Sequence, residues 1–222
     1  MKAILFGSIG TLVETSELQR EAFNMAFNEY GLKWQWDQTT YQSALANSGG
    51  LERIARYAKS VGEEVDAKSI HETKTQIFQR SLDERLLSLR DGVDSVLTLA
   101  SENGLKTAFV STTDLRTVER LKSVVSSTTQ TTFDIVTSVQ NGFSQKPAPD
   151  AYLHVLDQLN VKSVDAVVIE DNVAGVKAAN SAGCFVIAFP GQNTLSHDYR
   201  CADLVVGSDL FSQVKKLIST GS

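Results

Sequence analysis

Two adjacent carboxylates, Glu170 and Asp171, follow directly on the apolar run 166–169. Acidic groups at the end of a buried strand are costly unless a cation lies close, because a buried charge has to be paired. Magnesium binds through few carboxylates and keeps several waters, which suits a short loop of this kind. The pair therefore predicts an Mg²⁺ site. The alternative interpretation is that Asp171 or Asn172 caps a helix that starts near Val173.

A second set of residues could bind an anion. Ser111 and Thr112 follow the apolar run 106–110 and offer hydroxyl and backbone N–H groups, which are suited to holding an anion. Lys146 opens the sequence KPAPD and could pair, as a compact point charge, with a phosphate or with the two carboxylates. Each has an ordinary alternative, which is a turn before the helix that starts near Asp114 for the hydroxyl residues and a solvated surface charge for Lys146.

Short apolar runs alternate with helical patterns and must position these residues. Such runs are typical of buried parallel strands, and the alternation implies right-handed βαβ crossovers. The expected fold class is therefore α/β, with a doubly wound parallel sheet, and ligands bind such sheets beyond the carboxyl ends of the strands. The predicted strands span 2–6, 106–110, 133–136, 166–169, 184–189 and 204–206, and the predicted helices span 93–103, 114–125, 150–160, 173–182 and 210–219.

The stretch 15–85 interrupts this alternation. Apolar residues recur in it at helical spacing in four places and no strand pattern is convincing, which predicts a helical insertion with a small core of its own. The expected division is a core domain of residues 1–14 and 86–222 and an inserted helical domain of residues 15–85. The hydroxyl-rich tract 126–132 predicts a polar loop, because Ser and Thr side chains compete with helix hydrogen bonds.

Composition excludes several classes of protein. The 222 residues are 42% hydrophobic, and 26 acidic against 21 basic residues give a net charge of −5, which disfavours nucleic acid as a partner. No apolar run approaches the roughly 20 residues that cross a membrane, and the apolar start 1–6 is too short for a signal peptide. Cys184 and Cys201 are too few for a disulfide framework. We expect a cytoplasmic protein without nucleic-acid or membrane partners, of undetermined oligomeric state.

Taken together, the motifs resemble those of the haloacid dehalogenase (HAD) superfamily, and most closely its phosphoglycolate phosphatase and β-phosphoglucomutase group, called CbbY-like. Ser111 and Thr112 match the second motif, where the hydroxyl residue binds the transferred phosphoryl group. Lys146 matches the third motif, where a lysine steadies the phosphate and the nucleophile. The run IEDNVAGVKAA at 169–179 matches the fourth motif, where the acids hold magnesium. The resemblance implies a HAD fold, a mobile cap at 15–85 and a small phosphorylated metabolite or phosphate as ligand.

The first motif departs from the family pattern. The family has Phe-Asp-x-Asp-Gly-Thr-Leu, and this chain reads FGSIGTL at 6–12. By the resemblance, Gly7 replaces the aspartate that attacks phosphorus, and Ile9 replaces the aspartate that acts as general acid and base. Because the family's nucleophile also ligates the metal, Mg²⁺ is expected to bind weakly or to be lost. The donors that remain are Asp171, Glu170 and the Ile9 backbone carbonyl.

These losses predict a phosphatase-like family member that is impaired or inactive in standard phosphoryl transfer and keeps the phosphate-binding residues Ser111, Thr112 and Lys146. Ser8 is not expected to replace the nucleophile, because successive strand residues point to opposite sides and no base is evident beside it. Two alternatives stay open. One is an active small-molecule phosphatase with a non-standard nucleophile, and the other is a non-catalytic metabolite-binding or partner-regulating protein.

The insertion contains few indications of the ligand. Gln19 falls where the β-phosphoglucomutases have a histidine, which weakens the mutase interpretation. Arg53 and Lys74 could reach an anionic substrate, although an exposed helix face explains them equally well. The stretch 47–50 falls where the family's cap specificity loop lies, and the tryptophans in 34–36 are expected to pack between the first two helices.

Overall fold

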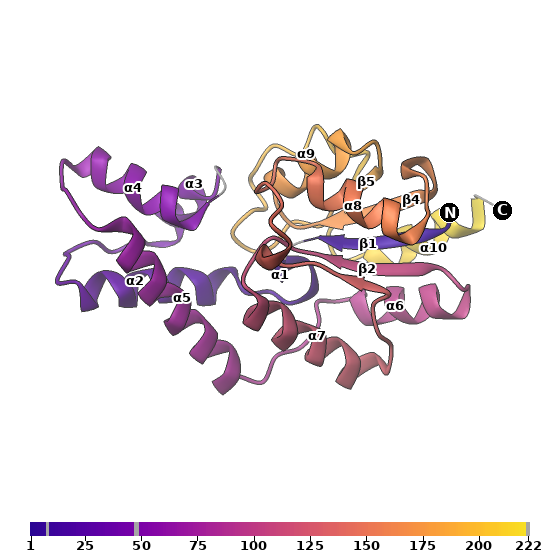
Figure 1. Ribbon diagram of the computed structural model, residues 1–222, viewed down its shortest axis with the longest axis horizontal. Coiled ribbons are helices and arrows are strands. Elements are labelled where there is room, and N and C mark those ends of the chain that lie inside the picture. The colour runs from indigo at the N-terminus through magenta and orange to yellow at the C-terminus, as the bar shows by residue number, and fades with distance from the viewer. Residues whose placement is uncertain (8, 47–48, 221–222) are drawn as a thin grey trace.

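The computed structural model describes residues 1–7, 9–46 and 49–220 (Figure 1). Within these residues, six parallel strands form one sheet in the order β3-β2-β1-β4-β5-β6. The order reverses direction beside β1, as in a doubly wound sheet, so the predicted fold class is confirmed. The strands are β1 (Ala3–Gly7), β2 (Lys106–Val110), β3 (Ile135–Val136), β4 (Ala166–Glu170), β5 (Phe185–Ala188) and β6 (Leu204–Val205).

Helices cover both faces of the sheet, because alternate residues of the central strands are apolar on both sides. In β1, Ile4 and Phe6 pack into one hydrophobic cluster, whereas Ala3 and Leu5 pack into the other. The first cluster is closed by α6 (Val93–Glu102), α7 (Leu115–Thr129) and α10 (Leu210–Thr220). The second is closed by α8 (Asp150–Leu159) and α9 (Val173–Ser181), which lie above the sheet in Figure 1.

Between β1 and α6, the four helices that follow α1 lie together at one end of the molecule, at the left of Figure 1. They bury a separate hydrophobic cluster that draws on residues 18–82. Trp34 and Trp36 belong to it and pack on Phe27 with ring centroids 5.2 and 4.8 Å apart, so their predicted packing role is confirmed. The four helices are α2 (Ser16–Glu29), α3 (Gln38–Ala44), α4 (Gly50–Val61) and α5 (Ala67–Glu84).

The tract 126–132 is the main error in the predicted elements. Helix α7 continues through Thr129, and only the rest of the tract is irregular. The hydroxyls of 126–129 donate to carbonyls three or four residues earlier, for example Thr128 to Val124 O at 2.8 Å. The side chains therefore bond back onto the helix instead of ending it. The sequence also does not predict α1 (Ile9–Leu12), because a single turn is too short to show a helical pattern.

Candidate functional site

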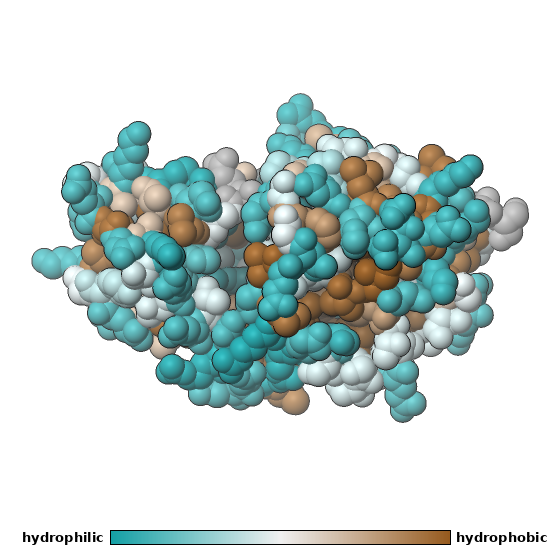
Figure 2. Space-filling view, in the orientation of Figure 1, coloured by the Kyte–Doolittle hydropathy of each residue, from teal (hydrophilic) through white to brown (hydrophobic). Residues whose placement is uncertain are grey.

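The carboxyl ends of β1, β2 and β4 lie side by side, because β1 pairs with both other strands. A pocket of about 250 Å³ lies beyond these ends, between the sheet and the helices α2–α4. The space-filling view shows a recess between these two parts (Figure 2). Of the residues predicted from sequence, the pocket lining includes Ile9, Ser111, Thr112, Lys146 and Asp171, and the insertion adds Gln19, Tyr41, Gly49 and Arg53. Of the rest of the 47–50 stretch, Gly50 begins α4 and is not part of the pocket lining, and residues 47 and 48 lie outside the described residues, as does Ser8.

Ser111 and Thr112 follow β2 and precede α7, which starts after Asp114 caps it by accepting from Thr117 N at 2.8 Å. The Ser111 hydroxyl oxygen accepts from Thr113 N at 3.1 Å, so its hydrogen stays free to be donated to a ligand. The Thr112 hydroxyl instead donates to Gln145 Oε1 at 3.0 Å. The two residues therefore line the pocket with unequal capacity to donate.

Lys146 is buried, and its ammonium group is fully occupied by protein acceptors. It donates to Glu170 Oε1 at 2.6 Å, to Val110 O at 2.8 Å and to Tyr152 Oη at 3.1 Å. An ammonium group has three N–H donors. The predicted partnership of Lys146 with a carboxylate is thus present, and the partner is Glu170.

Glu170 lies apart from the pocket, in contrast to its neighbour Asp171. Its side chain is completely buried, and Oε1 also accepts from Tyr152 Oη at 2.6 Å. Its second oxygen, Oε2, is buried without a hydrogen-bond partner among the described residues. Burial, reinforced by the adjacent Glu170 charge, raises the pKa of the Tyr152 phenol well above its usual value. The phenol is therefore a permanent donor to this carboxylate.

Two glycines make room for the Glu170 carboxylate. A Cβ atom on Gly7 would overlap Glu170 Oε1 and Tyr152 Oη, and a Cβ atom on Gly175 would overlap the same carboxylate. Gly7 and Glu170 are next to each other across β1 and β4, since the preceding residues Phe6 and Ile169 are register partners. We call this space, bounded by Gly7, Gly175 and Tyr152, the glycine slot. The carboxylate thus fills the position that a side chain at residue 7 would take.

Asp171 is the carboxylate that faces the pocket. Its Oδ1 accepts from Thr11 Oγ1 at 3.3 Å and from Asn172 Nδ2 at 3.0 Å. Burial raises the pKa of its carboxyl to about 6, and Glu170 adds to the rise while Arg90 opposes it. The helix cap considered from sequence is made by Asn172, whose Oδ1 accepts from Gly175 N at 3.0 Å.

The donors expected to hold Mg²⁺ do not fit that ion as the structure arranges them. Glu170 is bound to Lys146, whereas the Ile9 carbonyl accepts from Val13 N at 3.1 Å within α1 and keeps its second lone pair. Asp171 is then the one expected carboxylate that lines the pocket. No cluster of three metal-binding side chains occurs in residues 1–7, 9–46 and 49–220. For Glu170 to ligate a metal in the pocket, it would have to leave Lys146, so its predicted metal role stays a prediction.

Two residues of the site were missed by sequence reasoning. Arg90 donates to the carbonyls of Gly10, Phe189 and Pro190 at 3.0, 2.8 and 2.7 Å, and thereby ties α1 to the segment after β5. Nothing in the local sequence indicates this, because the three carbonyls come from distant segments. Tyr152 is the second, because the hydrophobic pattern of the predicted helix 150–160 carries no information about a tyrosine hydroxyl.

The insertion brings two buried cations near the pocket. Arg53 lines it, and Arg53 Nε donates to Ala44 O at 3.0 Å. Lys74 does not line the pocket itself. It donates to the lining residue Gln19 and packs on the rings of Phe23 and Phe78. Burial, followed by the nearby Arg53 charge, lowers the pKa of Lys74 to about 7. The exposed-helix interpretation of both residues is therefore wrong, since each is less than one-tenth exposed.

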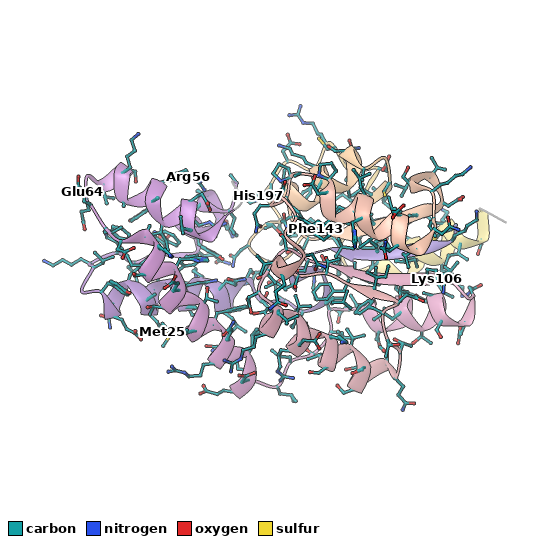
Figure 3. All side chains as sticks on the ribbon, viewed as in Figure 1. Met25, Arg56, Glu64, Lys106, Phe143 and His197 are labelled. Atoms are coloured by element: carbon teal, nitrogen blue, oxygen red, sulfur yellow. The ribbon has the colours of Figure 1, made fainter. Side chains whose placement is uncertain are left out.

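The insertion also contacts the sheet region directly. His197 lies where the two parts meet (Figure 3), and its Nε2 is 3.0 Å from Gln42 O in α3. On another side, Arg116 of α7 pairs with Asp83 of α5 at 2.6 Å. No helix in the described part of the chain is long and apolar enough to cross a membrane.

A family model, a relative and two solved structures all relate this chain to haloacid dehalogenase-like proteins. The family model for the haloacid dehalogenase-like hydrolases matches residues 4–189. Protein CbbY of Cereibacter sphaeroides is 35% identical over 212 residues, which cover 94% of this chain and 92% of that relative. The crystal structure of CbbY from Rhodobacter sphaeroides in complex with phosphate has a TM-score of 0.80 and 34% identity, and the match covers 93% of both chains. A mutant of that protein, in complex with xylulose-(1,5)bisphosphate, has a TM-score of 0.81 at the same identity and coverage.

Proposed function

This chain belongs to the haloacid dehalogenase-like hydrolase family, and on that premise we propose that it binds a small phosphorylated metabolite without cleaving it by the standard route. The observation that carries the proposal is the glycine slot. The position expected for the attacking aspartate is Gly7, and its space is filled by Glu170. The pocket beside it keeps Ser111, Thr112 and Lys146.

The chemistry of phosphoryl transfer supports the absence of turnover. Covalent transfer requires an oxygen nucleophile in line with phosphorus, and glycine has no side chain. A general acid–base group contributes roughly 10²–10⁴-fold to rate, and Ile9 cannot exchange a proton. Glu170 does not replace the nucleophile, because its carboxylate is buried and bound to Lys146 and Tyr152. Asp171 already accepts from Thr11 and Asn172 at the pocket wall.

The charge and shape of the pocket support a phosphate ester as ligand. Its floor holds Ser111, Thr112 and Lys146, whereas the guanidinium of Arg53 lines the side formed by the insertion. Cationic groups at both ends suit a ligand with two anionic ends. Because the similar CbbY structures contain phosphate and xylulose-(1,5)bisphosphate, a sugar bisphosphate is the first ligand to try.

The proposal assigns residues 15–85 as a cap over a core domain of residues 1–14 and 86–222. Support comes from the separate hydrophobic cluster of α2–α5 and from the insertion residues in the pocket lining. Mg²⁺ is assigned a minor role in this proposal, because Glu170 is held by Lys146 and leaves Asp171 as the one expected carboxylate in the pocket lining. A cytoplasmic location belongs to the same proposal, and the oligomeric state is left open.

Titration calorimetry combined with a phosphate-release assay tests the proposal. We expect binding of inorganic phosphate and of xylulose 1,5-bisphosphate, with affinities that change little between excess EDTA and millimolar Mg²⁺, and no phosphate release. Uncharged xylulose is the matched ligand control. Ser111→Ala is the matched protein variant, because it removes the hydroxyl that is free to donate, and it should weaken phosphate binding while leaving the fold intact.

The two alternatives predict different results. An active phosphatase with a non-standard nucleophile would release phosphate from at least one ester in the assay. A protein that only regulates partners would bind neither phosphate nor the bisphosphate. Either result would overturn the proposed function.

A further inference from the structure

The ammonium group of Lys146 has no free donor for a ligand. Its three N–H groups are matched by the acceptors Val110 O, Tyr152 Oη and Glu170 Oε1, all within 3.1 Å. A phosphate that uses Lys146 must therefore displace one of these acceptors. We infer that Glu170 is an internal competitor of the phosphate ligand, and that its carboxylate sets the affinity of the pocket by holding Lys146. This inference rests on the proposed function.

Among the three acceptors, Glu170 is the one that a phosphate can replace with a group of the same charge. The Val110 carbonyl is part of β2, and Tyr152 is held in the helix α8. The Glu170 contact pairs opposite charges in a buried site, where such a pair is strong and the charges are poorly screened. An anionic ligand offers Lys146 the same type of contact, so the two anions compete for one cation.

The glycine slot explains why the Glu170 carboxylate lies beside Lys146. The slot admits the carboxylate only because residues 7 and 175 both lack a Cβ atom. The Tyr152 hydroxyl then holds Oε1 from the other side at 2.6 Å. A larger residue at position 7 would expel Glu170 and release Lys146. The loss of the side chain at residue 7 is thus coupled to the pairing of Lys146.

The incomplete hydrogen bonding of Glu170 favours its replacement by a ligand at Lys146. One of its oxygens, Oε2, is buried without a hydrogen-bond partner among the residues that the structure describes. A buried carboxylate with an unsatisfied oxygen is under-stabilised compared with one that is fully bonded. The contact is therefore strong enough to occupy Lys146 and incomplete enough for a ligand to replace it.

Calorimetric titration of inorganic phosphate into three variants tests the inference. Glu170→Gln keeps the shape and removes the charge, and phosphate affinity should rise about tenfold, as expected for removal of one nearby buried like charge. Gly7→Ala should raise affinity by a different route, because its methyl group expels the unchanged Glu170. Glu119→Gln, on the exposed surface of α7, makes the same change in net charge and should leave affinity unchanged.

The possible outcomes separate the inference from the proposed function. Tighter binding by Glu170→Gln and Gly7→Ala than by the wild-type protein supports the inference. Binding by these variants alone supports the competition by Glu170 and overturns the proposed binding function of the wild-type protein. If wild-type protein binds phosphate and both variants bind it equally or more weakly, the inference is overturned and the proposed function stands. If no variant binds phosphate, both are overturned. Should Gly7→Ala fail to fold, Tyr152→Phe takes its place, because it removes the hydroxyl that holds Glu170.

Discussion

The Glu170 carboxylate occupies the space that a side chain on Gly7 would fill. The two residues lie on adjacent strands, one step beyond the register pair Phe6 and Ile169, and face the same layer of helices. The relationship accounts for two features at once. The chain lacks the expected nucleophile, and one of its two expected metal-binding acids is paired with Lys146.

Restoring the two missing aspartates should produce a phosphatase. In the double variant Gly7→Asp, Ile9→Asp, the new side chain at position 7 expels Glu170 from the glycine slot and supplies both a nucleophile and a metal ligand. We expect Mg²⁺-dependent phosphate release that the wild-type protein lacks, with stability lowered by about 1–3 kcal/mol from crowding. The matched control, Gly7→Asn with Ile9→Asn, should remain inactive. Equal activity in wild-type and restored proteins would contradict the account.

Removing Lys146 should expose the cost of burying Glu170. In Lys146→Met the carboxylate loses its buried cation, and the free energy of unfolding should fall by about 3–5 kcal/mol in urea denaturation. Adding Glu170→Gln to this variant removes the unpaired charge and should recover part of the loss. No recovery in the double variant would show that the pair is not coupled as described.

Lys74 should make the free energy of unfolding depend on pH between about 7 and 10.5. Its pKa falls from 10.5 to about 7 in the folded protein, chiefly through burial, so between these values the unfolded chain holds the additional proton. Stability then rises as the pH increases through this range. We expect Lys74→Met to be more stable than wild type near neutral pH, and this advantage should shrink towards about pH 10. A pH-independent difference in chemical denaturation would exclude this titration.

Arg90 should hold α1, which lines the pocket through Ile9 and Gly10, against the segment after β5. Its guanidinium reaches three carbonyls, and a lysine ammonium cannot match that planar arrangement. Arg90→Lys should therefore lower the free energy of unfolding by about 1–3 kcal/mol and weaken phosphate binding. Arg85→Lys, in an exposed pair with Glu21, is the control and should change stability by no more than about 0.5 kcal/mol. Equal effects of the two changes would argue against this role.

The sequence predicts the sheet and most helices because apolar runs and helical spacing reflect burial directly. It also places Ser111, Lys146 and Asp171 correctly at one edge of the sheet, since the carboxyl ends of parallel strands meet there. The predicted loop at 126–132 is wrong over 126–129, because hydroxyl side chains can bond back onto a helix as well as break one.

The orientation of Glu170 is the part that motif reasoning missed. The adjacency of Glu170 and Asp171 predicts one shared cation site, whereas successive strand residues point to opposite faces. By this alternation Glu170 turns to the layer of α8 and α9, and Asp171 turns to the pocket. The alternation was available from the sequence. The meeting of Glu170 with Gly7, Gly175 and Tyr152 was not, because it depends on packing between four distant segments.

Phosphorus NMR of a single sample tests the central claim most directly. Xylulose 1,5-bisphosphate is mixed with an equal amount of wild-type protein and Mg²⁺ and followed over many hours. The account predicts that the ester signals shift or broaden through binding to the protein and that the ester stays intact, without the inorganic phosphate signal. Growth of the inorganic phosphate signal above that of a protein-free sample would contradict it, when the hydrolytic activity is removed together with the protein by ultrafiltration.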